Sequence, residues 1–174
     1  MRAAVFHEPG TPLTVENVED PSPAAGQVVI AVKRCGICGT DLHATEEHDG
    51  LLVPGTVMGH EFAGEIVEVG QNCPTDWKPG RKVTGLPSHS CGQCLPCKTG
   101  KPMQCEKNII LGLQRSGGFA EYMTLDTHNS VLLPDSIDGC DVVIRLVGMF
   151  WHQRRVVFDL ASAAASKCGE SAST

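Results

Sequence analysis

Residues 59–70 read GHEFAGEIVEVG and carry the clearest information about the fold. Apolar and polar side chains alternate after His60, which is typical of a β-strand with one buried face. Glycines stand at both ends of the stretch, where turns are expected. The imidazole of His60, placed directly before this strand, is a candidate metal ligand. The stretch therefore predicts a strand that begins beside a metal-binding side chain.

Short runs rich in β-branched and apolar residues predict further strands on both sides. They lie at 2–6 (RAAVF), 13–19 (LTVENVE), 27–33 (QVVIAVK), 81–86 (RKVTGL), 119–125 (FAEYMTL) and 129–134 (NSVLLP). Turn sequences separate the first three runs, which predicts a meander. Residues 35–47 predict a loop that leads into a short helix, with Thr40 and Asp41 as candidate N-caps. With 19 Gly, 11 Pro and 5% aromatic residues, the chain is expected to be mainly β with short helices, as a small barrel or sandwich.

The length and charge exclude several classes of protein. A chain of 174 residues with 41% hydrophobic content fits one globular core with an appended segment. The formal net charge is -6 and no Lys/Arg run occurs, so we expect no nucleic-acid partner. We find no signal-peptide pattern and no apolar run of about 18 residues, so we expect a cytoplasmic protein without a membrane segment. In that compartment the nine cysteines are expected to be metal ligands and free thiols.

Four cysteines gather in residues 90–106, SCGQCLPCKTGKPMQCE. They are Cys91, Cys94, Cys97 and Cys105, in the spacing C-x2-C-x2-C-x7-C. Four thiolates can close a tetrahedral shell around Zn²⁺, which leaves no position for substrate and makes the site structural. An iron–sulfur cluster is one alternative, but ferredoxin-type runs place the fourth cysteine closer to the third and follow it with Pro. Unligated thiols are the other alternative. We expect structural zinc that folds its own loop, because this segment has too little apolar content to pack alone.

A second, open site is indicated by Cys38 in CGICGTDLH and by His60. A set of Cys and His ligands completed by another Cys or a carboxylate, with one open position, is typical of catalytic zinc. The stretch from Gly59 to Cys73 also fits the signature of the zinc-containing alcohol dehydrogenases. The motif CGICGTDLH, the four-cysteine segment and GGFAEY follow in the order of that family. The chain thus resembles this family of the medium-chain dehydrogenase/reductase superfamily over residues 1–137, and is most similar to its polyol and butanediol dehydrogenases.

The resemblance implies a GroES-like β-barrel catalytic domain with a zinc-stapled lobe. It implies that Cys38 and His60 bind the catalytic zinc and that Glu61 is a near or alternate ligand. Asp41 would accept a hydrogen bond from His60 and fix its tautomer.

The resemblance also implies a reaction. Thr40 would take the proton of a small alcohol or polyol, and His43 would pass that proton towards solvent. Hydride would then move to NAD(P), for which no binding residues are identified in this sequence.

The remaining cysteines and histidines match no ligand pattern. Cys35 is expected to be a small buried hydrophobic side chain. The other three cysteines are expected to be structural or free thiols; they are Cys73, Cys140 and Cys168. The other five histidines are expected to be surface residues; they are His7, His48, His89, His128 and His152.

The sequence departs from the family after Gly139. No Gly-x-Gly-x-x-Gly motif follows a strand, so we expect a C-terminally truncated member without the Rossmann domain. Family members associate through that domain, so no oligomer is expected through the same surface.

The third zinc ligand of the family is also not found. Polyol-type members supply this ligand, often Glu followed by Pro, where this sequence places Arg145, so weak zinc binding at the open site is expected. We therefore assign 1–139 to the catalytic domain, 88–107 to the zinc lobe within it, and 140–174 to a divergent segment, apolar and then Ala/Ser-rich.

Two functions remain in view. The first is a zinc-dependent, NAD(P)-linked alcohol or polyol dehydrogenase represented by its catalytic domain, with little or no turnover alone. The second is a non-catalytic zinc-binding module whose apolar segment at 140–151 replaces the lost domain or docks on a longer relative. The particular alcohol, and the choice between NAD and NADP, are not determined by these residues.

Overall fold

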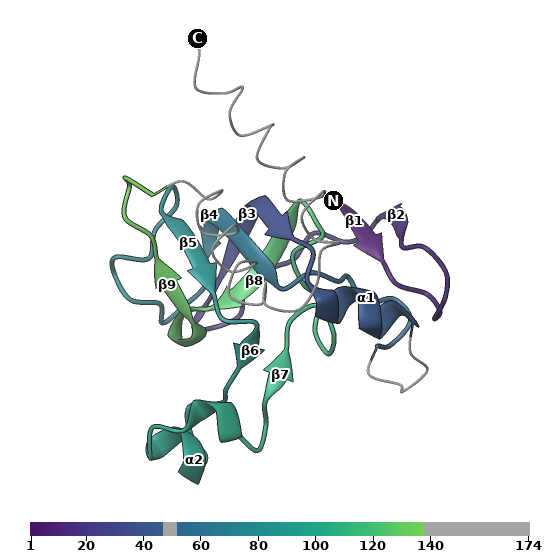
Figure 1. The fold of residues 1–174 in the computed structure, drawn as a ribbon. Coiled ribbons are helices and arrows are strands. Elements are labelled where there is room, and N and C mark those ends of the chain that lie inside the picture. The colour runs from purple at the N-terminus through teal and green to yellow at the C-terminus, as the bar shows by residue number, and fades with distance from the viewer. Residues whose placement is uncertain (47–51, 138–174) are drawn as a thin grey trace.

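A computed structural model describes residues 1–46 and 52–137 (Figure 1). The expected divergent segment, with Arg145, Cys140 and Cys168, lies outside these residues, as do His48 and His152. The elements are β1 Arg2–Val5, β2 Thr14–Asn17, β3 Gln27–Gly36, α1 Gly39–Glu46, β4 Glu61–Val69, β5 Lys82–Gly85, β6 Ser88–His89, α2 Leu95–Lys98, η1 Pro102–Gln104, β7 Ile109–Ile110, β8 Tyr122–Asp126, η2 Thr127–Asn129 and β9 Ser130–Leu132. Each predicted strand is present, and the fold is mainly β with short helices, as expected.

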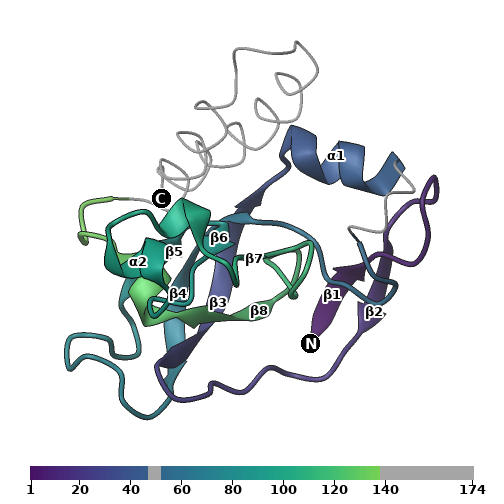
Figure 2. The same cartoon turned by 90° about the horizontal axis from the view of Figure 1, so that it is seen from below.

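Five strands form one antiparallel sheet in the order β8-β3-β4-β5-β9. The long strands β3 and β4 pair from Val28 opposite Val69 to Gly36 opposite Glu61. The register shifts twice along this pair, and such bulges bend a strand and increase its twist. The sheet is therefore curled, as the views in Figures 1 and 2 show.

The main core lies on this sheet. Phe62 and Ile66 of β4 pack with Ile30 of β3 and Leu125 of β8, and each is at most 1% exposed. Burying a side chain of this size contributes about 1.5–3 kcal/mol. Because Phe62 directly follows Glu61, the same packing fixes the start of β4.

The N-terminal hairpin of β1 and β2 is a separate two-stranded sheet. The predicted meander through β1, β2 and β3 is therefore wrong, since β2 pairs with β1 and β3 pairs with β4 and β8. The hairpin packs instead on the segment before His60, through a bridge between Val5 and Val57. The sequence pattern predicts strands and gives no information about such a long-range partner.

Helix α1 begins one residue after Cys38, so Thr40 and Asp41 lie inside it and are not its N-caps. Asp41 still satisfies a backbone donor at this end, because its Oδ2 accepts a hydrogen bond of 2.8 Å from the Cys38 N–H. A carboxylate in the first turn also interacts favourably with the helix dipole. The bond fixes Cys38 at the start of the helix.

Strands β6 and β7 form a short ribbon that carries α2 away from the sheet (Figure 1). Neither α2 nor η1 buries a side chain, so the predicted lack of an apolar core in this lobe is confirmed. Its base is tied to η2: Asn129 accepts bonds from the Ser90 N–H and Oγ and donates to the Ser90 carbonyl.

Asp126 joins the lobe to the sheet at the end of β8. Its carboxylate accepts hydrogen bonds from Gln27 Nε2 (2.8 Å), Arg115 Nη1 (2.8 Å) and His89 Nδ1 (2.7 Å). Burial by itself raises the pKa of Asp126, but the bonds from His89, Gln27 and Arg115 outweigh it and hold the pKa below its ordinary value. One ionised carboxylate therefore connects β3, β6 and the loop before β8.

We expect Asp126→Asn to destabilise the chain by about 2 kcal/mol, since hydrogen bonds to a charged group each contribute about 1.5–3 kcal/mol. A depressed folded pKa stabilises the fold above the unfolded pKa, and this contribution is lost as pH falls through the acidic range. The gap between wild type and variant should thus be full at pH 7 and shrink below about pH 4. Urea unfolding at several pH values measures it, with the exposed Asp76→Asn as the control. An equal effect of the two substitutions at pH 7 would contradict this role.

Among the helices of residues 1–46 and 52–137, none has the length and hydropathy that a membrane span requires.

Candidate metal centres

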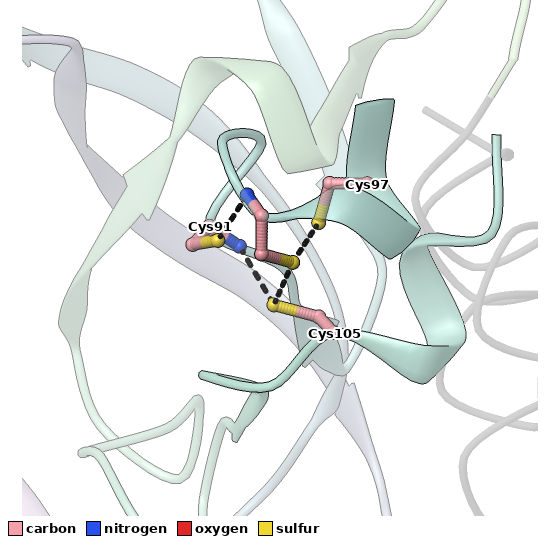
Figure 3. Close-up of side chains that lie close together, drawn as sticks. Cys91, Cys97 and Cys105 are labelled. Carbon is pink, nitrogen blue, oxygen red and sulfur yellow. Dashed lines mark hydrogen bonds between the residues drawn. The ribbon is translucent and has the colours of Figure 1, made fainter. Parts of the chain in front are cut away.

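The four cysteines of the lobe converge on one point (Figure 3). Their sulfurs all lie within 4.8 Å of one another. The Sγ atom of Cys94 lies 3.4 Å from that of Cys97 and 3.8 Å from that of Cys105. A tetrahedral shell with Zn–S bonds of about 2.3 Å places its sulfurs about 3.8 Å apart. The lobe therefore presents four thiols at the separation that a structural zinc site requires.

Backbone amides point at these sulfurs. The N–H of Cys91 donates to Cys105 Sγ (3.2 Å), and the N–H of Cys94 donates to Cys91 Sγ (3.4 Å). The backbone N–H groups of Gln93 and then Cys94 lower the pKa of Cys91 to about 6. Burial raises the pKa of Cys97 to about 11. The lobe thus favours thiolate at Cys91, and a bound cation would supply the remaining driving force to deprotonate Cys97.

The second site lies between α1 and β4. Cys38, directly before α1, and His60 and Glu61, where β4 begins, are all buried. Their ligand atoms also lie within 4.8 Å of one another. The structure brings together the two predicted ligands and places the predicted alternate ligand Glu61 with them. These residues are one soft, one borderline and one hard donor, a combination that zinc accepts in its open sites.

Unpartnered polar atoms show that this site fits a cation. Among the described residues, both carboxylate oxygens of Glu61 are buried without a hydrogen-bond partner. Such a group normally costs free energy unless something compensates its charge. Burial raises the pKa of Glu61. A divalent cation bound between Cys38, His60 and Glu61 would satisfy these oxygens.

Asp41 stands behind His60. Its Oδ1 lies 3.3 Å from His60 Nδ1, and both side chains are less than 10% exposed. Burial by itself lowers the pKa of His60, but the Asp41 carboxylate and the Cys38 thiol outweigh it and raise the pKa to about 10. Because the Asp41 contact favours a proton on Nδ1, Nε2 is the ring nitrogen that would lose its proton when a metal binds.

The two residues predicted to handle the proton lie on α1. Thr40 is exposed, and its Oγ1 lies 3.6 Å from Cys38 Sγ. His43 is exposed one turn further along. Thr40 therefore lies beside Cys38, and His43 is an exposed residue of the same helix.

The prediction that His89 is a surface residue is wrong. It is 4% exposed, and its Nδ1 contacts Asp126. The alternating pattern of β6 is too short to reveal this burial. Cys35 packs against the main core as expected, and burial raises the pKa of its thiol. All cysteines in the described part of the chain are free thiols.

Comparison with known proteins indicates the same family as the sequence motifs do. The alcohol dehydrogenase GroES-like domain model matches residues 24–135. The chain is 38% identical over 140 residues to L-threonine 3-dehydrogenase of Chelativorans sp. (strain BNC1), covering 79% of this chain and 40% of that protein. The chain spans about 40% of the length of the curated relatives it matches.

Solved structures agree with these sequence matches. A short chain alcohol dehydrogenase of Escherichia coli CFT073, in complex with NADH, matches with a TM-score of 0.75 and 35% identity over 83% of this chain and 41% of that one. Galactitol-1-phosphate dehydrogenase of Escherichia coli matches with a TM-score of 0.75 and 32% identity, again over 83% of this chain and 41% of that one. The fold and the sequence thus match the same group of proteins. The chain belongs to the alcohol dehydrogenase GroES-like domain family of the zinc-containing medium-chain dehydrogenases.

Proposed function

We propose that this chain is the metal-binding catalytic domain of a zinc-dependent, NAD(P)-linked dehydrogenase of a small alcohol or polyol. The observation that carries the proposal is the buried group of Cys38, His60 and Glu61, whose carboxylate oxygens lack any other partner among the described residues. The dehydrogenases of threonine and galactitol 1-phosphate among its relatives support the substrate class. We place the domain at 1–139, with its zinc lobe at 88–107, in the reducing cytoplasm.

The two centres have different roles in this proposal. The lobe cysteines form a closed shell of sulfur that holds structural zinc. Cys38, His60 and Glu61 would hold the catalytic zinc, which when bound acts as a Lewis acid that lowers the pKa of an alcohol. Glu61 would supply the third ligand of this site.

The chain's own residues would hold and move the proton. Asp41 fixes the ring of His60 so that Nε2 faces the donor set. Thr40, whose hydroxyl lies beside Cys38, accepts the alcohol proton and donates its own, and His43 takes that proton towards solvent. The described residues offer no nucleotide-binding βαβ unit, so hydride transfer to NAD(P) by this chain alone is expected to be weak or absent.

A cobalt(II) titration tests the proposal, because cobalt reports its ligands by colour. We expect two classes of site, one with the intense charge-transfer bands of a four-thiolate shell and one with weaker bands. Adding imidazole should shift only the second spectrum, since only the second site keeps a position open. A single class of site that ignores imidazole would overturn the proposal.

The second candidate function is a non-catalytic zinc-binding module, which also has support. The four cysteines of the lobe lie within one segment of this chain, so the lobe could bind zinc without the group of Cys38, His60 and Glu61. The same titration separates the two functions, because the module requires only the four-thiolate class. An NADH titration of the metal-loaded chain then decides whether it binds cofactor unaided.

A further inference from the structure

His60 owes its position to the residue before it. Gly59 has a φ of 91°, in the left-handed region that side chains rarely adopt. Its carbonyl group belongs to the peptide unit that carries the His60 N–H. Any displacement of Gly59 is therefore passed directly to the backbone of His60.

Backbone hydrogen bonds hold this segment from a distant part of the chain. The N–H of Gly117 donates to the Val57 carbonyl (2.7 Å), that of Gly118 to the Gly59 carbonyl (2.7 Å), and that of Phe119 to the Met58 carbonyl (2.8 Å). The three donors belong to the loop directly before β8. They therefore hold the segment before His60 through a loop that is distant in sequence.

The contacts around Gly59 are too close for side chains. A Cβ added at Gly117 would lie 2.0 Å from the Gly59 carbonyl oxygen and 2.7 Å from the Cα of Gly112. A Cβ added at Gly112 would lie 2.7 Å from the Gly59 nitrogen. On its own Cβ side, Gly59 meets the ring of Phe119, whose Cδ1 would lie 2.5 Å from an added Cβ. Backbone atoms cannot move aside as the end of a flexible side chain can.

We propose that Gly112, Gly117 and Phe119 form a clamp on Gly59 that positions His60 for metal binding. The clamp rests on the proposed function, because it matters through the metal held by Cys38, His60 and Glu61. Metal ligands must be held within about 0.5 Å of their working position, so a displaced peptide unit before His60 weakens the site. These are positioning residues, since none of them is a ligand.

Gly117→Ala tests the clamp, and its neighbour provides a matched control. Ser116, directly before Gly117 in the same loop, is exposed, so Ser116→Ala changes the loop without adding an atom next to Gly59. We expect Gly117→Ala to weaken cobalt(II) binding at the Cys38–His60 site by about 10–100-fold, as loss of a supporting partner does. The four-thiolate spectrum should be unchanged. Ser116→Ala should retain both sites near their wild-type affinities.

A folded Gly117→Ala chain with the same second-site affinity as Ser116→Ala would overturn the clamp. If Gly117→Ala does not fold, Phe119→Ala decides, because its side chain is only half-buried and its deletion frees Gly59 from the other side. Unchanged second-site affinity in that folded variant would equally overturn the clamp.

Failure of the proposed function gives a different result. A wild-type chain that binds no second cobalt contradicts the catalytic site, and NMR of the metal-free chain still tests the clamp. The amide and ring resonances of His60 should move in Gly117→Ala and stay in place in Ser116→Ala. Resonances of His60 that move equally in the two variants would contradict the clamp.

Discussion

Cys97→Ser should abolish metal binding in the lobe and unfold it locally. The lobe depends on its four thiolates, because α2 and η1 bury no side chain and only Cys105 of the four is buried. For a segment without a core, metal-binding free energy is folding free energy. We expect the metal content to fall by about one ion, and Tm to fall by about 4–8 °C if about 2 kcal/mol is lost in a chain of this size.

Hydrogen exchange tests whether the unfolding in Cys97→Ser is confined to the lobe. The amides of Lys98 and Thr99, which donate to the carbonyls of Cys94 and Leu95, should lose protection in Cys97→Ser. Amides of the five-stranded sheet should keep theirs, because the sheet has its own core. Cys73→Ser, at a half-buried cysteine outside both metal groups, is the control. A Cys97→Ser chain that retains its metal, its Tm and its lobe protection would refute the structural-zinc assignment.

His60→Ala should remove the second metal and leave the first in place. The substitution deletes one of the three proposed ligands. Loss of a partner that only supports a ligand lowers metal affinity by about 10–100-fold, so loss of a ligand itself should lower the affinity for the second metal further. It also leaves the buried Asp41 carboxylate without the His60 ring that lies 3.3 Å from it. Dehydrogenase activity, if the chain supports any with added cofactor, should disappear.

Isothermal titration of the metal-free chain with Zn²⁺ measures the loss. His7→Ala is the control, because His7 is exposed and pairs with Glu16 far from both metal groups along the sequence. A His60→Ala chain that binds the same number of zinc ions as His7→Ala would show that the second centre lies elsewhere or does not exist.

Much of the fold follows from local sequence pattern. The strand from Glu61 and the strand from Gln27 are predicted by their alternating and β-branched residues, and both are present. The pairing of β1 with β2 alone is not predicted, because strand patterns do not name their partners. The start of α1 is also misplaced, since Thr40 and Asp41 are both typical N-cap residues while the helix begins before them.

The candidate sites are predicted unequally. The lobe ligands follow from spacing alone, because Cys91 and Cys105 flank the other two within one short excursion. Cys38 and His60 lie in separate sequence motifs. Their assignment to one catalytic zinc site came from the resemblance to the family, and the structure then shows their ligand atoms close together. The burial of His89 against Asp126 and the contact of Gly117 with Gly59 have no local signal. Both depend on contacts between segments that only the folded chain brings together.

The most direct test of the account is the zinc content of the chain, determined by elemental analysis of protein purified without chelator. The account predicts a ratio near two per chain, since the four-cysteine lobe and the group of Cys38, His60 and Glu61 each bring their ligand atoms within 4.8 Å of one another. A ratio near one would contradict the catalytic centre and leave a domain held only by its structural zinc. A ratio near zero would contradict both centres.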